Sequence, residues 1–180
     1  MDALATAVGG SKATLYRYFS GKEDVFKAVI MASGEALFRD LETLTPTGRD
    51  LEASLEALGM AYLTLILDAR VVEVGRMVIS EAMRFPELGD IFFRQGPERT
   101  AGKIAAALSD LAARHRCPGL ATPAAARHFM AMCQADLYDL RLWGVARHTG
   151  RGAMESAVRA ACARFLDGYR LEEERSAAHP

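Results

Sequence analysis

Apolar residues recur every three or four positions along most of this chain, as they do in helices that bury one face. One apolar stripe runs from residue 22 to about residue 44 and ends at the breakers Thr45-Pro46-Thr47-Gly48. Over residues 50–68 the apolar residues cover much of the circumference, which predicts a buried helix. No stretch shows the sustained polar and apolar alternation that is typical of a strand. The pattern therefore predicts an all-α protein.

Proline and glycine divide the middle of the chain into further helices. A helix is expected over residues 69–85, because Pro86 lacks an amide donor and disfavours helical geometry in the residue before it. A short helix should follow over residues 86–94 and stop at Gly96-Pro97. The middle of the chain is thus expected to hold short helices with distinct breaks between them.

The last part of the chain predicts three longer helices. The first spans residues 98–116. Thr122 suits an N-cap, with Pro123 at the first helical position, for one uninterrupted helix that ends near residue 143. The third helix carries a single apolar seam and ends before the charged tail that begins at Glu172.

A glycine pair separates two short helical segments near the N-terminus. Leu4 and Val8 lie four residues apart and would stack on one face of the first segment. Gly9 and Gly10 end this segment, and Ser11 can cap the one that follows. Two short helices joined by a tight glycine turn are typical of a helix-turn-helix.

The second short helix presents basic, hydroxyl and aromatic groups on the face opposite Leu15 and Phe19. That face suits a DNA groove, because such groups donate to phosphate oxygens and a small residue near the helix start allows close approach to base edges. Lys22 opens a third helix, whose N-terminal amides favour an anion. The candidate DNA-contacting residues are Ser11, Lys12, Ala13, Thr14, Tyr16, Arg17, Tyr18 and Lys22.

The overall charge gives no support for nucleic acid, since the net charge is −1 and the isoelectric point is about 6.4. From charge alone, Lys12, Arg17 and Lys22 would be read as an ordinary solvated face. The motif around them favours DNA contact instead. The overall charge does not exclude such contact, because a dimer can present two local basic faces while the rest of the chain is acidic.

Residues 5–19, followed by Lys22-Glu23-Asp24-Val25-Phe26, resemble the DNA-binding region of the TetR family of transcriptional regulators. The glycine turn, the Thr-Leu-Tyr-x-Tyr-Phe sequence and the opening of the next helix are all in register. Family members usually carry valine in place of Gly10. The chain begins inside the second helix of the family, so we expect the full protein to have residues before Met1.

Residues 72–88, which end in Phe85-Pro86-Glu87-Leu88, are similar to the AefR-like C-terminal domain of one TetR branch. The two resemblances imply a helix-turn-helix region at residues 1–30 and a helical ligand-binding and dimerisation domain at residues 31–180. They imply a repressor that binds a palindromic operator in double-stranded DNA as a homodimer. They also imply that a small apolar or aromatic ligand releases this repressor. In this family the last two helices pair across a two-fold axis.

Flexible and aromatic apolar residues are candidates for the ligand pocket, although each of them could equally serve ordinary core packing. These residues are Met60, Met77, Met83, Phe92, Phe93, Phe129 and Met132. The seam of the last helix is the candidate dimer interface, although it could also close the core of a single chain. Its residues are Met154, Ala157, Val158, Ala161, Cys162, Phe165 and Tyr169.

Catalytic and metal-binding patterns are not found in the sequence. There is no nucleophile and base pair, carboxylate pair, metal-ligand spacing or phosphate-binding glycine loop, so we expect no enzyme and no cofactor. Cys117, Cys133 and Cys162 are widely spaced, which favours reduced thiols over a disulfide framework. No apolar run suits a membrane span, and we expect a cytoplasmic protein. A helical protein that binds a small molecule or a partner without binding DNA stays an alternative.

Overall fold

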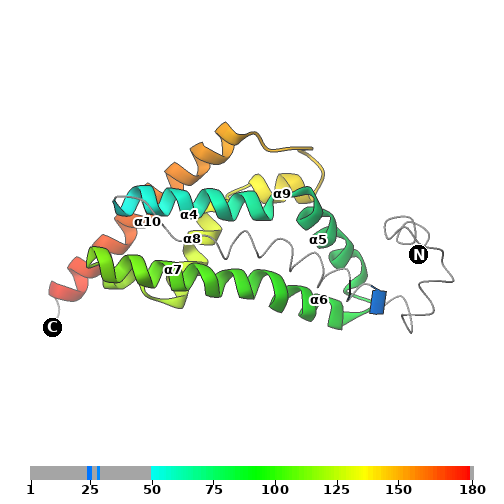
Figure 1. Ribbon diagram of the computed structural model, residues 1–180, viewed down its shortest axis with the longest axis horizontal. Helices are drawn as coiled ribbons and strands as arrows, with labels where there is room; N and C mark the ends of the chain where they lie inside the picture. The colour runs from blue at the N-terminus through cyan, green and yellow to red at the C-terminus, as the bar shows by residue number, and fades with distance from the viewer. Residues whose placement is uncertain (1–23, 26–27, 29–49, 179–180) are drawn as a thin grey trace.

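The computed structural model describes Asp24, Val25, Ala28 and residues 50–178, with side chains up to Tyr169 (Figure 1). The elements in this part of the chain are helices and helical turns, without a strand, in agreement with the expected all-α fold. In order they are α4 (Leu51–Ile66), α5 (Ala69–Glu81), α6 (Pro86–Phe93), the π-helical turn η1 (Arg94–Glu98), α7 (Arg99–His115), the 3₁₀ turn η2 (Pro118–Leu120), α8 (Pro123–Gln134), α9 (Leu137–Leu142) and α10 (Arg151–Ala178).

The main core lies between α4, α7, α8 and α10. Helix α10 packs against α4 and α8, while α7 packs against α8. Phe129 of α8 meets Phe165 of α10 edge to face, with ring centroids 5.2 Å apart, and both side chains are fully buried. Aliphatic side chains fill the space around this pair, among them Leu55, Leu63, Ile104, Leu108 and Leu111.

A second, smaller apolar cluster joins α5 to α6. Val78 and Leu88 are buried at its centre, and the partly buried residues Val74, Met77, Phe85, Ile91 and Phe92 pack around them. This cluster is separate from the main core, so α5 and α6 form a corner at one end of the helical body (Figure 1).

The segment expected to break at Gly96-Pro97 instead continues as helix. Helix α6 passes through η1 directly into α7, and the three form one long rod in Figure 1. A π-helical turn bonds residue i to residue i+5, and this wider turn tolerates the missing amide of Pro97. The end of the α-helix at Phe93 agrees with the expected end near residue 94, but the expected break at Gly96-Pro97 was wrong.

The expected single helix from residue 122 to residue 143 is divided into α8 and α9. Thr122 caps the first part as predicted, because its hydroxyl accepts from the amide of Ala125 at 3.0 Å. The break comes at Ala135, which has a φ of 42° although it is neither glycine nor proline. After this break α9 packs against α5. The break was not predicted, because neither glycine nor proline stands at this position.

Helix α4 buries only part of its circumference, contrary to the expectation for residues 50–68. Leu55, Leu58 and Tyr62 face the core, but Ala53 and Ala57 are exposed. Alanine counts as apolar in a sequence pattern, yet its small side chain loses little when it faces water. The neighbouring helix α5 is also shorter than expected and ends at Glu81.

Arg116 closes α7 in the left-handed conformation, with φ of 57° and ψ of 45°. Glycine adopts this conformation without the steric cost of a Cβ atom. We therefore expect Arg116→Gly to raise the free energy of unfolding by about 0.5–1 kcal/mol in urea denaturation. Arg114→Gly, inside the same helix, is the control and should lower it by about 1 kcal/mol. Unfolding of Arg116→Gly at a lower urea concentration than the parent would contradict this expectation.

Candidate functional site

A cavity of about 570 Å³ lies where α7 and α8 face each other beside α4. This volume falls within the range of small-molecule sites in proteins. The lining is mostly apolar and comprises Tyr62, Phe93, Pro97, Glu98, Ala101, Gly102, Ala105, Pro123, Arg127, Met130, Ala131 and Gln134. We refer to this space as the α7–α8 cavity.

Small residues on α7 leave the α7–α8 cavity open. Ala101, Gly102 and Ala105 follow one another at helical spacing, so no long side chain from α7 enters the space. A Cβ atom built on Gly102 would meet no neighbour within 4 Å. The π-helical turn contributes a second wall, because it carries Pro97 and follows directly on Phe93. Such turns occur frequently at functional sites.

Tyr62 and Gln134 form a polar pair within the lining. The Tyr62 side chain is almost fully buried, and Gln134 lines the same cavity. Burial is the main reason that the pKa of Tyr62 is raised, and the nearby Cys133 and Tyr138 raise it further. Tyr62 is therefore a neutral hydroxyl at physiological pH, able both to donate and to accept a hydrogen bond.

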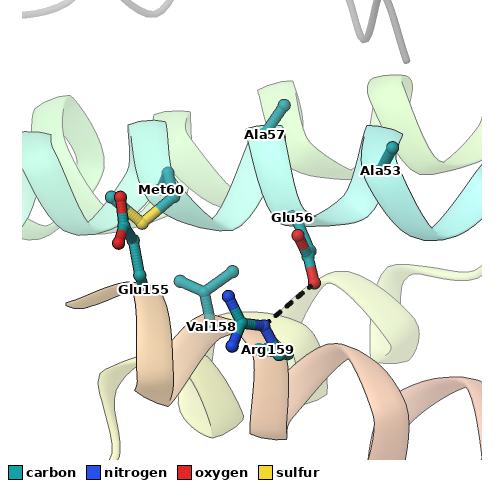
Figure 2. A pocket seen from close by; sticks show the side chains of 7 residues that line it. All are labelled: Ala53, Glu56, Ala57, Met60, Glu155, Val158 and Arg159. Carbon is teal, nitrogen blue, oxygen red and sulfur yellow. Dashed lines mark ion pairs between the residues drawn. The ribbon is translucent and has the colours of Figure 1, made fainter. Parts of the chain in front are cut away.

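A smaller hollow of about 380 Å³ lies between α4 and α10, as Figure 2 shows. Its alanines come from α4, while α10 contributes Val158 and Arg159. The charged side chains on its walls already have partners: Arg159 Nε lies 3.9 Å from Glu56 Oε1, and Glu155 accepts from Arg151 at 2.7 Å. With its charges paired, this α4–α10 hollow offers fewer groups to orient a ligand than the α7–α8 cavity does.

The seven residues expected to form one ligand pocket do not come together. Only Phe93 lines the α7–α8 cavity, and Met60 lines the α4–α10 hollow. Phe129 lies in the main core, while Met77 and Phe92 belong to the α5–α6 cluster. The last two of the seven, Met83 and Met132, are 94% and 42% exposed. The seven residues are thus divided among different parts of the fold, because residue type and helical spacing do not reveal which helix faces meet. Their part in ligand binding stays a prediction.

The expected dimer seam of α10 lies mostly inside the single chain. Buried residues of the main core account for Met154, Val158, Ala161, Cys162 and Phe165. Ala157 and Tyr169 are partly buried against the same core. These residues pack onto α4 and α8, so the alternative of an intramolecular core is the one that the structure supports. Ala157 and Tyr169 keep part of their surface exposed, and the role of the seam in a dimer stays a prediction.

Small side chains gather on the exposed faces of α8 and α10. On α10, Ala153, Ala160 and Gly168 are exposed at helical spacing, and a Cβ atom at Gly168 would meet nothing within 4 Å. The exposed positions of α8 on the side toward α10 are Ala124, His128 and Met132. His128 Nδ1 lies 3.0 Å from the hydroxyl of Tyr169, so the two helices adjoin there. We refer to these exposed positions as the α8–α10 face.

Two arginines that the sequence analysis missed join α4, α5 and α9. Arg76 of α5 donates through Nε to the carbonyl of Leu142 at 2.7 Å and through a second nitrogen to the carbonyl of Arg141. Arg141 is itself buried and donates to the carbonyl of Leu67 at 3.3 Å and to that of Arg147. Arg141 stands four residues after Leu137, on the apolar stripe of the same helix. A charged residue on an apolar stripe is a signal that could have indicated a buried structural arginine.

The candidate DNA-contacting residues from Ser11 to Lys22 lie outside the described residues. Within the described residues, no helix is long and apolar enough to span a bilayer, and no three potential ligands form a metal site. The three cysteines are free thiols, and burial raises the pKa of Cys162 to about 12.

Comparison with known families gives two matches that together span most of the chain. Residues 53–171 match the AefR-like transcriptional repressor C-terminal domain. Residues 1–29 match the N-terminal region of the bacterial regulatory proteins of the tetR family. The second match includes all eight candidate DNA-contacting residues.

Solved structures also resemble the chain. The flavonoid-responsive regulator FrrA is 32% identical, with a TM-score of 0.71 over 93% of this chain and 85% of that chain. A crystal structure described as a TetR-family transcriptional regulator, from Mesorhizobium loti MAFF303099, is 24% identical, with a TM-score of 0.78 over 91% of this chain and 82% of that chain. The latter likeness concerns the fold alone. No curated protein matches the chain.

Proposed function

The chain belongs to the TetR family of bacterial transcriptional regulators, and from this premise we propose that it is a ligand-released repressor that acts as a homodimer. Membership makes it a DNA-binding helix-turn-helix regulator and not an enzyme. The observation that carries the finer proposal is the α7–α8 cavity, which lies within the segment that matches the AefR-like repressors. We expect the protein to act on DNA in the cytoplasm.

The proposed DNA contacts are the eight residues from Ser11 to Lys22 that the family match includes. A two-fold dimer places its two recognition helices about 34–36 Å apart, one turn of DNA, and therefore requires a roughly palindromic operator. Lys12 and Ala13, near the start of the second helix, are proposed to contact base edges. Lys22 is proposed to bind a phosphate.

The α8–α10 face is proposed as the dimer interface. Two observations support it: the face consists of exposed small side chains that allow close helix approach, and it includes the half-exposed Met132. A two-fold interface uses the same surface of both copies, and the small side chains of Ala153, Ala160 and Gly168 leave room there for a helix of the second copy. The last long helices thus keep the role that the family implies, but through residues other than the buried seam.

The proposed release needs no chemical step. A ligand can bind more tightly to a conformation in which the spacing of the two recognition helices does not fit the operator. Such a ligand lowers the operator affinity by the same factor by which operator binding lowers the ligand affinity. FrrA is described as flavonoid-responsive, so flavonoids are the first compounds that we propose to test here. An aromatic compound of that size is compatible with a cavity of about 570 Å³.

Operator binding is tested by the mobility shift of the protein's own upstream DNA over a range of salt concentrations. We expect tight binding at one palindrome, with affinity that falls steeply as salt rises. Lys22→Ala should weaken binding to all sequences alike and reduce the salt slope by about 1, whereas Lys12→Ala should change the preference among sequences. Lys103→Ala, on the exposed side of α7, is the charge-matched control and should change neither.

Two results would oppose this part of the proposal. Unchanged binding by both Lys12→Ala and Lys22→Ala would mean that the second short helix does not contact the DNA groove. Absence of any operator binding at low salt would favour a ligand-binding protein that does not act on DNA.

A further inference from the structure

The arrangement of polar groups in the α7–α8 cavity indicates what kind of molecule it accepts. We infer that the cavity binds an uncharged aromatic molecule whose hydroxyl or carbonyl group hydrogen-bonds to the Tyr62–Gln134 pair. This inference rests on the proposed function, in which the same cavity is the effector site. It goes further by assigning the ligand class and the residues that select it.

The walls of the cavity suit a flat ring. Phe93, Pro97, Pro123 and Met130 present apolar surfaces from two sides. Between these surfaces, α7 contributes only the small residues Ala101, Gly102 and Ala105, so no long side chain fills the space. An aromatic ring can bury both faces against such walls, which is the main source of affinity in apolar pockets.

The Tyr62–Gln134 pair supplies the orienting group. Tyr62 is almost fully buried, so its hydroxyl remains in a place from which bulk water is largely excluded. The hydroxyl of Tyr62 and the amide of Gln134 both line the cavity, and together they offer donors as well as acceptors. A ligand hydroxyl or carbonyl can use these groups, whereas a plain hydrocarbon leaves them unused.

The charged residues of the lining do not favour a charged ligand. Arg127 and Glu98 are of opposite sign, and both are exposed to solvent. Attraction of an anion to Arg127 would be opposed by Glu98, and both interactions are weakened by water and salt. An ionised group placed deeper, beside Tyr62, would find only neutral partners and would lose its hydration.

The ligand class is tested with three probes that share one ring system, using the full chain and isothermal titration calorimetry. The probes are 2-naphthol, naphthalene and 2-naphthoate, which carry a neutral hydroxyl, no polar group and an anionic group. We expect 2-naphthol to bind most tightly, about three- to ten-fold more tightly than naphthalene, as one added hydrogen bond predicts. The naphthoate anion should bind least tightly of the three.

Tyr62→Phe removes the hydroxyl and keeps the ring that packs in the core. It should weaken 2-naphthol binding by about three- to ten-fold and leave naphthalene binding nearly unchanged. Equal loss for both probes would indicate a merely structural role of Tyr62 and would overturn the inference. Tightest binding of 2-naphthoate, or no binding of any probe to the parent protein, would overturn it as well.

Gly102→Leu locates the site. The new side chain projects into open space within the cavity, and leucine favours the helix more than glycine, so folding should be retained. We expect 2-naphthol binding to fall at least about ten-fold, because the leucine occupies the ring position. Ala57→Leu, which partly fills the α4–α10 hollow instead, is the matched control and should bind 2-naphthol as the parent does. Loss of binding in Ala57→Leu alone would overturn the assignment of the cavity.

Operator release by 2-naphthol is measured separately in the mobility-shift assay. Binding that follows the expected probe order without any effect on the operator complex supports the assigned ligand class and contradicts the effector role. Release of the operator by 2-naphthoate but not by 2-naphthol supports an effector role and overturns the ligand class. The two proposals can therefore fail independently.

Discussion

Ala160→Glu is expected to convert the proposed dimer into monomers and to weaken operator binding by at least about 100-fold. Ala160 lies on the exposed side of α10, within the α8–α10 face, at a position where a helix of a second copy would pack closely. The two-fold axis introduces the carboxylate twice. Burial of two like charges close to each other costs several kcal/mol, more than a small apolar face can offset.

Light scattering coupled to size exclusion measures the oligomeric state of Ala160→Glu, and the mobility shift measures its operator affinity. Ala113→Glu makes the same chemical change on the exposed side of α7, outside the α8–α10 face. This control should stay dimeric and bind DNA as the parent does. A dimeric Ala160→Glu with parental operator affinity would show that the interface lies elsewhere on the molecule.

Phe165→Ala is expected to lower the free energy of unfolding by about 3–5 kcal/mol. The Phe165 side chain is fully buried, where it packs edge to face on Phe129 and lies 4.7 Å from the ring of Tyr169. Its removal leaves a cavity where α8 and α10 meet, which the surrounding helices can close only in part. Such a loss is a large fraction of the stability of a typical domain.

Urea denaturation of Phe165→Ala and of the parent, at one protein concentration, measures this loss. Trp143→Ala is the control, because Trp143 is 72% exposed and its removal should change the free energy of unfolding by less than about 0.5 kcal/mol. If Phe165→Ala were as stable as the parent, α10 could not be part of the monomer core. For the same reason, truncation from Gly150 onward should give an insoluble chain, since it removes Phe165 and the buried residues around it.

Local signals in the sequence were reliable where one residue determines the outcome. Thr122 caps α8 through its own hydroxyl, and Phe85, the residue before Pro86, lies outside helical geometry with φ of −132° and ψ of 79°. Gly96-Pro97 carried an equally strong local signal but failed, because a π-helical turn absorbed the proline without ending the helix. The difference lies in the turn type, which the two residues by themselves do not reveal.

Less of the candidate site than of the fold could be predicted from the sequence. Methionine and phenylalanine residues were expected to form a pocket, but the α7–α8 cavity exists chiefly because Ala101, Gly102 and Ala105 leave space. An absent side chain gives no signal in a sequence of an alanine-rich helix. Tyr62 and Gln134 are separated by more than seventy residues, and only the packing of α4 against α8 brings them together.

The sequence by itself determined the helical character of this protein and its membership of the TetR family. Both depend on local information: apolar residues at helical spacing, and the dense motif from Gly9 to Lys22 that a family comparison can match. Only the tertiary structure decided which face of α10 is core and which is free for a second copy, and where a ligand can fit. Helical periodicity shows that a face is apolar, but the identity of its neighbour depends on contacts between segments far apart in the chain.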